Sequence, residues 1–141
     1  MKFSTLASIA LTATVAASCS TTPADETRSP AAAKELADAI AGKVAGPPQR
    51  CINSYATLDM KVIDDFTLLF SERGRNTVVY VQNPRGGCYG LDSGTRTLVT
   101  KQFGTRSLCD GDINDMIDLA SHTSGGSCVF GPFVPYTKPK G

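Results

Sequence analysis

The chain has little of what nucleic-acid binding or catalysis requires. It contains no tryptophan and one histidine, and its formal net charge at pH 7 is +1. This balance gives no basic excess, so we expect no nucleic-acid partner. The single histidine, His122, stands in a Ser/Thr/Gly segment with no nucleophile–base pair or metal cluster near it in the sequence. We therefore expect no enzymatic activity, no cofactor and no metal site.

The strongly apolar segment at the start of the chain is too short to span a membrane. Lys2 precedes it, and residues 3–17 are apolar apart from Ser and Thr. A spanning helix needs about 20 apolar residues. A positive start, an apolar centre and small residues at the end describe a secretory signal peptide instead. Its removal takes away Lys2, the only charge in residues 1–18, so the formal charge falls from +1 to zero.

Cys19 follows three small residues, as the lipid-modified cysteine of a bacterial lipoprotein does. We predict a lipoprotein signal peptide over residues 1–18 and attachment to the membrane through a lipid on Cys19. The alternative is ordinary cleavage after Ala17, which would secrete the protein to the periplasm. Ser20 in the second mature position resembles lipoproteins that are sorted onward. The predicted location is therefore the cell envelope, at the periplasmic face of the outer membrane.

The remaining cysteines form an even set in an oxidising compartment, which predicts two structural disulfides. They are separated by 37, 21 and 19 positions with no CxxC pair, unlike the ligands of a zinc site. Four cysteines allow three pairings. We favour the nested pairs Cys88–Cys109 and Cys51–Cys128, because the outer bridge would join the two ends of the domain. In the chain-entropy model each bridge contributes on the order of 3 to 4.5 kcal/mol.

A tether and a short helix are predicted ahead of the first of these cysteines. Residues 19–30 are mostly polar and aperiodic, which is typical of a flexible tether. Ser29 and Pro30 form a helix start, with Ser as N-cap and Pro at the first helical position. The spacing then predicts a short amphipathic helix over residues 31–46. We favour a helix packed on the domain, because it has only three large apolar residues; a partner-binding or membrane-lying helix is the alternative.

Beyond the helix, short apolar runs recur at intervals that are typical of an antiparallel β domain. The domain is predicted over residues 47–137, followed by a tail at 138–141. We expect a mainly β fold, a small antiparallel β-barrel or sandwich stapled by disulfides. Helical spacing within residues 112–119 favours a helical turn there. The expected strands are residues 61–63, 67–70, 77–81, 97–103, a short piece ending at 109, and 128–133.

Three polar groups resemble sites, and each has a simpler structural interpretation. The acidic residues in 110–115 resemble the start of a calcium loop but lack the Gly and the final acid that such a loop needs; we favour an acidic turn that caps a short helix. Asp64 and Asp65 would point to opposite faces of a strand, so we interpret them as a turn. The Gly-rich residues 83–87 lack the Lys-Ser/Thr ending of a phosphate-binding loop. They are predicted to position Cys88.

The aromatic residues could line a ligand pocket. In a small β domain without tryptophan, aromatic side chains at alternating strand positions are mostly core, and we favour that interpretation. The residues concerned are Tyr80, Tyr89, Phe103, Phe130, Phe133 and Tyr136.

The chain resembles an uncharacterised family of small four-cysteine bacterial envelope lipoproteins over about residues 36–136. Family members usually carry Arg where this chain has Phe66 and Pro where it has Tyr89. The resemblance implies an envelope location and a four-cysteine framework, and it implies no activity. The segments that carry it are residues 50–52, 62–70, 88–91, 108–112 and 128–133.

These observations favour a non-catalytic envelope lipoprotein that acts as a structural or protein-interaction module. The alternative is a binding module for a small ligand, a peptidoglycan fragment or a foreign enzyme, by analogy with small lipid-anchored β-barrel inhibitors. An envelope protein is the expected partner in the first case. A concave aromatic or apolar cavity would favour the second.

Overall fold

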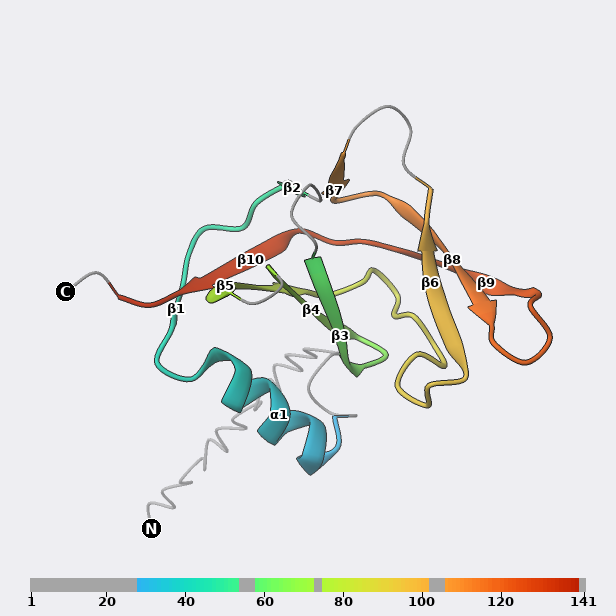
Figure 1. Cartoon of the computed structure of the whole chain (residues 1–141), viewed down its shortest axis with the longest axis horizontal. Helices are drawn as coiled ribbons and strands as arrows, with labels where there is room; N and C mark the ends of the chain where they lie inside the picture. Colours follow the sequence, from blue (N-terminus) through green and yellow to red (C-terminus); the bar gives the residue numbers. More distant parts are fainter. Residues whose placement is uncertain (1–27, 54–57, 73–74, 102–105, 140–141) are drawn as a thin grey trace, which may run out of the picture.

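The computed structural model describes residues 28–53, 58–72, 75–101 and 106–139 (Figure 1). Within these ranges the chain forms one helix and ten strands. They are α1 (Pro30–Ile40), β1 (Val44–Ala45), β2 (Cys51–Asn53), β3 (Leu58–Asp64), β4 (Thr67–Glu72), β5 (Arg75–Gln82), β6 (Arg96–Thr100), β7 (Ser107–Cys109), β8 (Ile113–Asp118), β9 (Ser124–Val129) and β10 (Phe133–Thr137).

The strands form three antiparallel sheets in a sandwich-like arrangement. Five strands pair in the order β1-β10-β5-β4-β3, three pair in the order β6-β8-β9, and β2 pairs with β7. In Figure 1 the five-stranded sheet lies above α1, and the three-stranded sheet lies at the end opposite the C-terminus. The predicted fold, mainly β and antiparallel with disulfides and a short helix, is confirmed. Among the described residues the sheets form a sandwich rather than a closed barrel.

The β3–β4 hairpin follows directly from its sequence. Short apolar runs on both sides of the Asp pair become β3 and β4, with a register shift between Val62 and Asp64. Asp64 Oδ1 accepts a hydrogen bond from the backbone N–H of Phe66 at 2.8 Å. An Asp side chain that bonds the backbone two residues ahead stabilises a turn. The predicted turn at Asp64 and Asp65 is confirmed.

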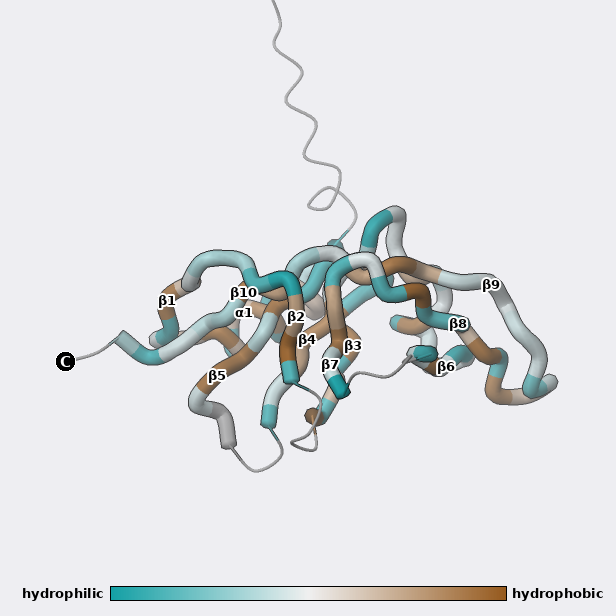
Figure 2. The backbone as a smooth tube through the Cα atoms, turned by 90° about the horizontal axis from the view of Figure 1, so that it is seen from above, coloured by the Kyte–Doolittle hydropathy of each residue, from teal (hydrophilic) through white to brown (hydrophobic). Residues whose placement is uncertain are grey.

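The larger core lies between the five-stranded and three-stranded sheets. Its centre is a triangle of Phe70, Phe130 and Phe133, whose ring centroids lie 5.7 to 5.8 Å apart in edge-to-face contacts. Such contacts contribute about 0.5–1.5 kcal/mol each beyond the burial of area. Figure 2 shows hydrophobic segments recurring along β4, β5 and β8. The other buried members are Ile52, Leu68, Cys88, Leu91, Leu108, Met116 and Cys128.

Helix α1 covers the other face of the five-stranded sheet. The Ser29 hydroxyl caps it by accepting a hydrogen bond from the Ala32 N–H at 3.1 Å, and Pro30 begins it, as predicted. Ala32 is buried with Ile63 and Leu69, so β4 has side chains buried on both of its faces. The helix therefore packs on the domain, as we favoured. No helix in the described part of the chain has the length and apolar character needed to cross a membrane.

The expected boundaries around α1 need correction. The helix ends at Ile40 rather than at residue 46, because Gly42 adopts a φ of +69° and turns the chain. Val44 then pairs with Thr137 in β1, so the last expected turn of helix is part of the sheet. The expected tether over residues 19–30 also extends too far, because Arg28 is already bonded to the domain.

Two expectations near the C-terminal end are wrong. The segment expected to be helical is strand β8, in which Asn114 and Met116 are buried. It pairs with β6 on one side and β9 on the other, and these two pairings hold its backbone in an extended conformation. Residues 128–133 are not one strand but the end of β9 and the start of β10. Gly131 lies at the break, where an added Cβ would stand 2.5 Å from the Asn83 carbonyl oxygen.

All four cysteines of the domain are bridged, but the nested pairing expected from the sequence, Cys88–Cys109 with Cys51–Cys128, is wrong. The bridges are Cys51–Cys109 and Cys88–Cys128. Pairing of β2 with β7 places Cys51 directly opposite Cys109, with their Cα atoms 4.0 Å apart. The turn at residues 83–87 brings Cys88 against β9, and Arg85 pairs with Val129 there. Strand register, rather than closure of the domain ends, decides the pairing.

Two buried amides in the core differ in how well they are satisfied. The Asn114 Oδ1 accepts a hydrogen bond from the Thr100 hydroxyl at 2.6 Å, and its Nδ2 donates to the Asp112 carbonyl at 3.1 Å. The Gln82 Nε2 reaches the Gly131 carbonyl at 3.5 Å, whereas its Oε1 has no hydrogen-bond donor among the described residues. Asn114 therefore stabilises the register of β6 and β8.

We expect the Cys88–Cys128 bridge to stabilise the fold more than the Cys51–Cys109 bridge. The chain-entropy difference between sequence separations of 40 and 58 favours the longer loop by only about 0.3 kcal/mol. Cys88 and Cys128 are 0% and 3% exposed, whereas Cys51 is exposed. Replacing the buried pair with alanine also leaves a cavity, which costs roughly 1–2 kcal/mol more.

Urea unfolding of two double variants checks this order. Cys88→Ala with Cys128→Ala should lose more free energy of unfolding than the matched control, Cys51→Ala with Cys109→Ala. If the buried-pair variant does not fold while the control does, the buried bridge is again the more stabilising one. An equal or larger loss in the control would contradict it.

Candidate functional site

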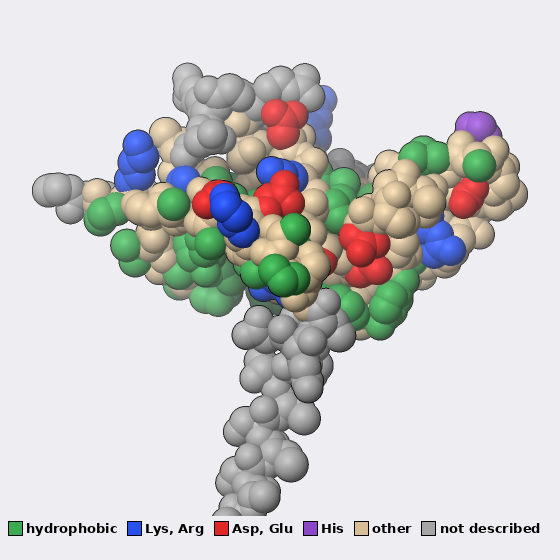
Figure 3. All heavy atoms as spheres, turned by 90° about the horizontal axis from the view of Figure 1, so that it is seen from below, with side chains coloured by type: hydrophobic (Ala, Val, Ile, Leu, Met, Phe, Trp, Pro, Cys, Tyr) green, Lys and Arg blue, Asp and Glu red, His purple; other side chains and the backbone are tan. Residues whose placement is uncertain are grey.

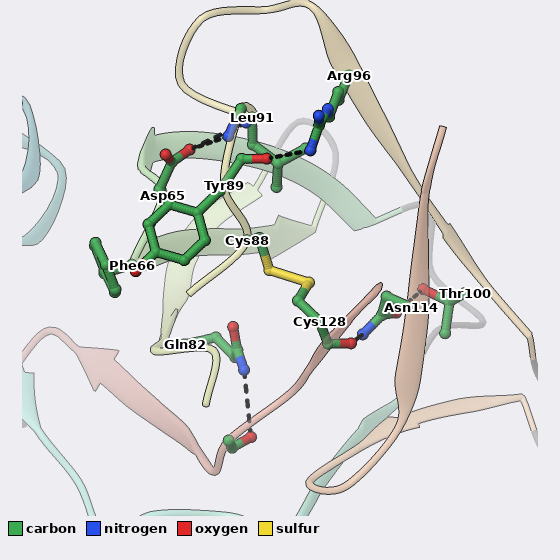
Figure 4. Close-up of a disulfide and its surroundings, with 12 residues drawn as sticks. Asp65, Phe66, Gln82, Cys88, Tyr89, Leu91, Arg96, Thr100, Asn114 and Cys128 are labelled. Carbon is green, nitrogen blue, oxygen red and sulfur yellow. Dashed lines mark hydrogen bonds between the residues drawn. A yellow bond between two sulfur atoms is a disulfide. The ribbon is translucent and has the colours of Figure 1, made fainter. Parts of the chain in front are cut away.

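The candidate site is a depression of about 320 Å³ at the β3–β4 turn. We call it the aromatic–acidic cleft. Two segments far apart in the sequence form it: the turn itself and the segment that follows the buried cysteine, Cys88. Figure 4 shows Asp65, Phe66 and Tyr89 close together on one side of the Cys88–Cys128 bridge. The lining residues are Arg28, Asp64, Asp65, Phe66, Tyr89 and Asp92.

Asp65 fixes one wall of the cleft to the other. Its Oδ1 accepts backbone N–H bonds from Gly90 and Leu91 at 3.0 Å and from Asp92 at 3.2 Å. Its carbonyl oxygen accepts a fourth bond from the Cys88 N–H at 2.6 Å. Successive backbone N–H groups that converge on one carboxylate oxygen form an arrangement like the backbone nests that bind anions. The loop is therefore held in place before any ligand arrives.

An aromatic pair lines the cleft. The rings of Phe66 and Tyr89 meet edge to face, with centroids 5.4 Å apart and an interplanar angle of 85°. Gly87 lies against the Phe66 ring, and a Cβ at that position would stand 2.6 Å from it. Tyr89 remains 58% exposed. The Tyr89 ring is thus exposed to solvent and packs against Phe66, whose ring is itself held against Gly87.

The charges of the cleft do not cancel. Arg28 Nε bonds Asp64 Oδ2 at 2.6 Å, both side chains are largely buried, and the Arg28 guanidinium also bonds the Thr67 hydroxyl. This pair neutralises itself. Asp65 and Asp92 have no ion-pair partner in the part of the chain that the structure describes, so the cleft keeps an excess of negative charge beside its aromatic ring.

One other depression is neutralised by its own residues. A groove of about 580 Å³ along α1 carries the pairs Lys34–Asp38 and Lys61–Glu35. Hydrogen bonding to Asp38 raises the pKa of Lys34. Figure 3 shows this face from below, with blue and red side chains together at its centre and further red ones toward the β8–β9 end. Grooves filled by paired surface charges offer little to a ligand.

The acidic set at residues 110–115 is divided among separate partners. Asp110 pairs with Arg85, Asp115 pairs with Lys101, and Asp112 Oδ2 accepts the Cys109 N–H at 2.7 Å. Asp110 lies in the turn before β8 and Asp112 follows it, whereas Asn114 and Asp115 lie within β8, so the turn is confirmed and the expected helix cap is wrong. Within the described ranges no three His, Cys, Asp or Glu side chains gather as a metal site would require.

His122 lies exposed at the β8–β9 turn, with a φ of +56°. The turn is held by Asp118, whose Oδ1 accepts bonds from the Ala120 and Ser121 N–H groups and from the Ser121 hydroxyl. The hydrogen bonds from Ser121 lower the pKa of the Asp118 carboxyl. These bonds serve the turn, and His122 stands outside every depression described above.

The aromatic residues singled out in the sequence do not share one pocket. Phe130 and Phe133 are core residues, whereas Tyr89 is exposed at the cleft; Phe103 lies outside the described residues. Sequence reasoning missed Phe66 as a site residue. Residues 66 and 89 lie far apart in the sequence, and only the fold brings their two rings into contact.

No family model, no curated protein and no solved structure matches this chain.

Replacing Gly87 with alanine should open the aromatic pair. Gly86 and Gly87 have φ values of +75° and +80°, so alanine at either position is strained, by about 1–2 kcal/mol. Only at Gly87 does the new methyl meet the Phe66 ring; at Gly86 it meets open space. Gly86→Ala is therefore a matched control.

The contact between Phe66 and Tyr89 can be followed by proton NMR. We expect Gly87→Ala to lose the cross-peaks between the two rings and roughly 1–3 kcal/mol more stability than Gly86→Ala, because overpacking adds to the strain. Equal stability and intact cross-peaks in both variants would show that Gly87 does not support the ring.

Proposed function

We propose that the protein is a lipid-anchored bacterial envelope protein whose aromatic–acidic cleft binds a cationic side chain of a membrane-proximal partner. The observation that carries this proposal is the exposed Tyr89 ring beside two carboxylates that no described cation neutralises.

The cysteine count supports the anchor. The chain has five cysteines, and the four of the β domain are bridged to one another. Cys19 is left over, directly after an apolar segment with the features of a signal peptide. Two bridges in so small a domain favour an oxidising compartment, where a bacterial lipoprotein would fold.

The start of the described chain supports a partner close to the membrane. Arg28 lines the cleft, nine positions after Cys19. Nine residues span at most about 32 Å when fully extended. A lipid on Cys19 would therefore keep the cleft within that distance of the bilayer. A partner that reaches the cleft must itself be an envelope protein or face the envelope.

The chemistry of the cleft favours an ammonium or guanidinium group. A cation over the face of an exposed tyrosine gains about 0.5–1 kcal/mol, and adjacent carboxylates add attraction of the same sign. A volume of about 320 Å³ lies at the lower end of ligand sites, so one side chain fits it better than an extended ligand does. The loop held by Asp65 is already ordered, which lowers the entropic cost of binding.

Titration of the full chain in detergent micelles tests the ligand class. N-acetyl-arginine amide should shift the NMR signals of Tyr89 and Asp92, and the neutral analogue N-acetyl-citrulline amide should not. Added salt should weaken the effect, because it screens the carboxylates. Equal shifts from both compounds, or shifts from a peptidoglycan fragment and none from the arginine compound, would contradict the proposal.

Binding of the partner to each variant can be measured by crosslinking in native envelopes, followed by capture of the protein. Tyr89→Ala and Asp92→Asn should each reduce capture about two- to fivefold, because each removes part of the attraction for the cation. Leu119→Ala and Asp38→Asn are the matched controls, an exposed apolar residue and an exposed acid away from the cleft. Equal losses in the controls, or none in the cleft variants, would overturn the assignment of the cleft.

A further inference from the structure

Arg96, the first residue of β6, lies between the loop that carries Tyr89 and the strand β9. Its Nη1 donates to the carbonyl oxygen of Tyr89 at 3.0 Å and to the carbonyl oxygen of Gly125 at 3.1 Å. Figure 4 shows the Arg96 side chain reaching the Tyr89 carbonyl. One guanidinium therefore joins a residue of the aromatic–acidic cleft to the three-stranded sheet.

The peptide group between Tyr89 and Gly90 is held at both of its polar ends. Arg96 donates to its carbonyl oxygen, and Asp65 Oδ1 accepts a bond from its N–H at 3.0 Å. The peptide is trans, so its C=O and N–H point in opposite directions, and Figure 4 shows Asp65 and Arg96 on opposite sides of the loop. A cation thus faces the negative end of the peptide dipole, and an anion faces its positive end. Charge-assisted hydrogen bonds of this kind are about twice as strong as neutral ones.

Two glycines leave the space that the Arg96 side chain occupies. A Cβ at Gly90 would stand 3.1 Å from Arg96 Cδ, and a Cβ at Gly125 would stand 3.0 Å from its Nε and Cζ. Gly90 also has a φ of +92°, which residues other than glycine rarely adopt. Glycine at both positions therefore lets the guanidinium approach the two carbonyls.

We propose that Arg96 is a positioning residue of the aromatic–acidic cleft, which holds the backbone from which the Tyr89 ring projects. The disulfide at Cys88 fixes the chain directly before Tyr89. The peptide held by Arg96 and Asp65 follows directly after it. The Tyr89 ring therefore keeps its edge-to-face contact with Phe66. The role of Arg96 in binding rests on the proposed function, whereas the ordering of the loop is a property of the free protein.

Amide hydrogen exchange of the free full-length chain in detergent micelles tests the ordering of the loop. Arg96→Met keeps a long side chain and removes its hydrogen-bond donors. The N–H groups of residues 90–92 should exchange at least about tenfold faster in this variant, because the loop loses a charge-assisted hydrogen bond. Arg96→Lys keeps a charged donor, so these groups should exchange more slowly in it than in Arg96→Met.

Arg85→Met is the matched control, because it removes an exposed guanidinium that pairs with Asp110 and does not line the cleft. Faster exchange confined to residues 90–92, with β4 and β5 unchanged, supports the positioning role. Faster exchange in all strands, or an equal effect of Arg85→Met, overturns it. If Arg96→Met does not fold, Gly125→Ala replaces it, because the φ of Gly125 is not left-handed and the new methyl displaces the guanidinium.

Titration with N-acetyl-arginine amide tests the role of Arg96 in binding. Arg96→Met removes a positive charge near a site for cations, so electrostatics alone would strengthen binding. Loss of a preordered loop has the opposite sign and should weaken binding about threefold or more. Unchanged or tighter binding by the variant overturns the positioning role. If the wild-type chain does not bind the compound, the proposed function fails, and the exchange result alone decides whether Arg96 positions Tyr89.

Discussion

The Cys88–Cys128 bridge is the constraint on which most of the structure depends. It joins the segment that leaves β5 of the five-stranded sheet to β9 of the three-stranded sheet, across 40 positions of sequence. Both cysteines are buried in the core that contains the Phe70, Phe130 and Phe133 triangle. Without this link the two sheets would be held by apolar contacts and a few polar ones such as the Arg85–Val129 bridge, and domains of this size bury only a modest core. The bridge thus fixes how the sheets face each other.

The same link positions the candidate site. Tyr89 follows Cys88 directly, and Asp65 receives the N–H groups of the next three residues. The loop is therefore held by the Cys88–Cys128 disulfide at its start and by hydrogen bonds to Asp65 in the β3–β4 turn. The Tyr89 ring and the Asp65 carboxylate are held without a ligand, which is the property that a preorganised binding site needs. A structural bridge and the candidate site share one short segment of chain.

Local signals were enough to predict much of this fold. Apolar runs flanked by Asp, Asn and Gly gave the β3–β4 hairpin and β5, and Ser29 with Pro30 marked the start of α1. Non-local features were not predictable in this way. The spacing of Ile113, Met116 and Ile117 imitates a helix, and only pairing on both sides makes the segment a strand. The cysteine pairing depends on the register of β2 with β7, and the cleft depends on a contact between residues 66 and 89; neither is encoded in local spacing.

The most direct test measures the lipid on Cys19 and the two disulfides in the same sample. The protein would be extracted from native envelopes and measured by intact mass and by non-reducing peptide mapping. The account predicts a chain that begins at Cys19, carries the added mass of a lipid there, has no free thiol, and yields crosslinked peptides for Cys51–Cys109 and Cys88–Cys128. An unmodified chain beginning at Ser18, two or more free thiols, or the nested pairing of the cysteines would contradict it.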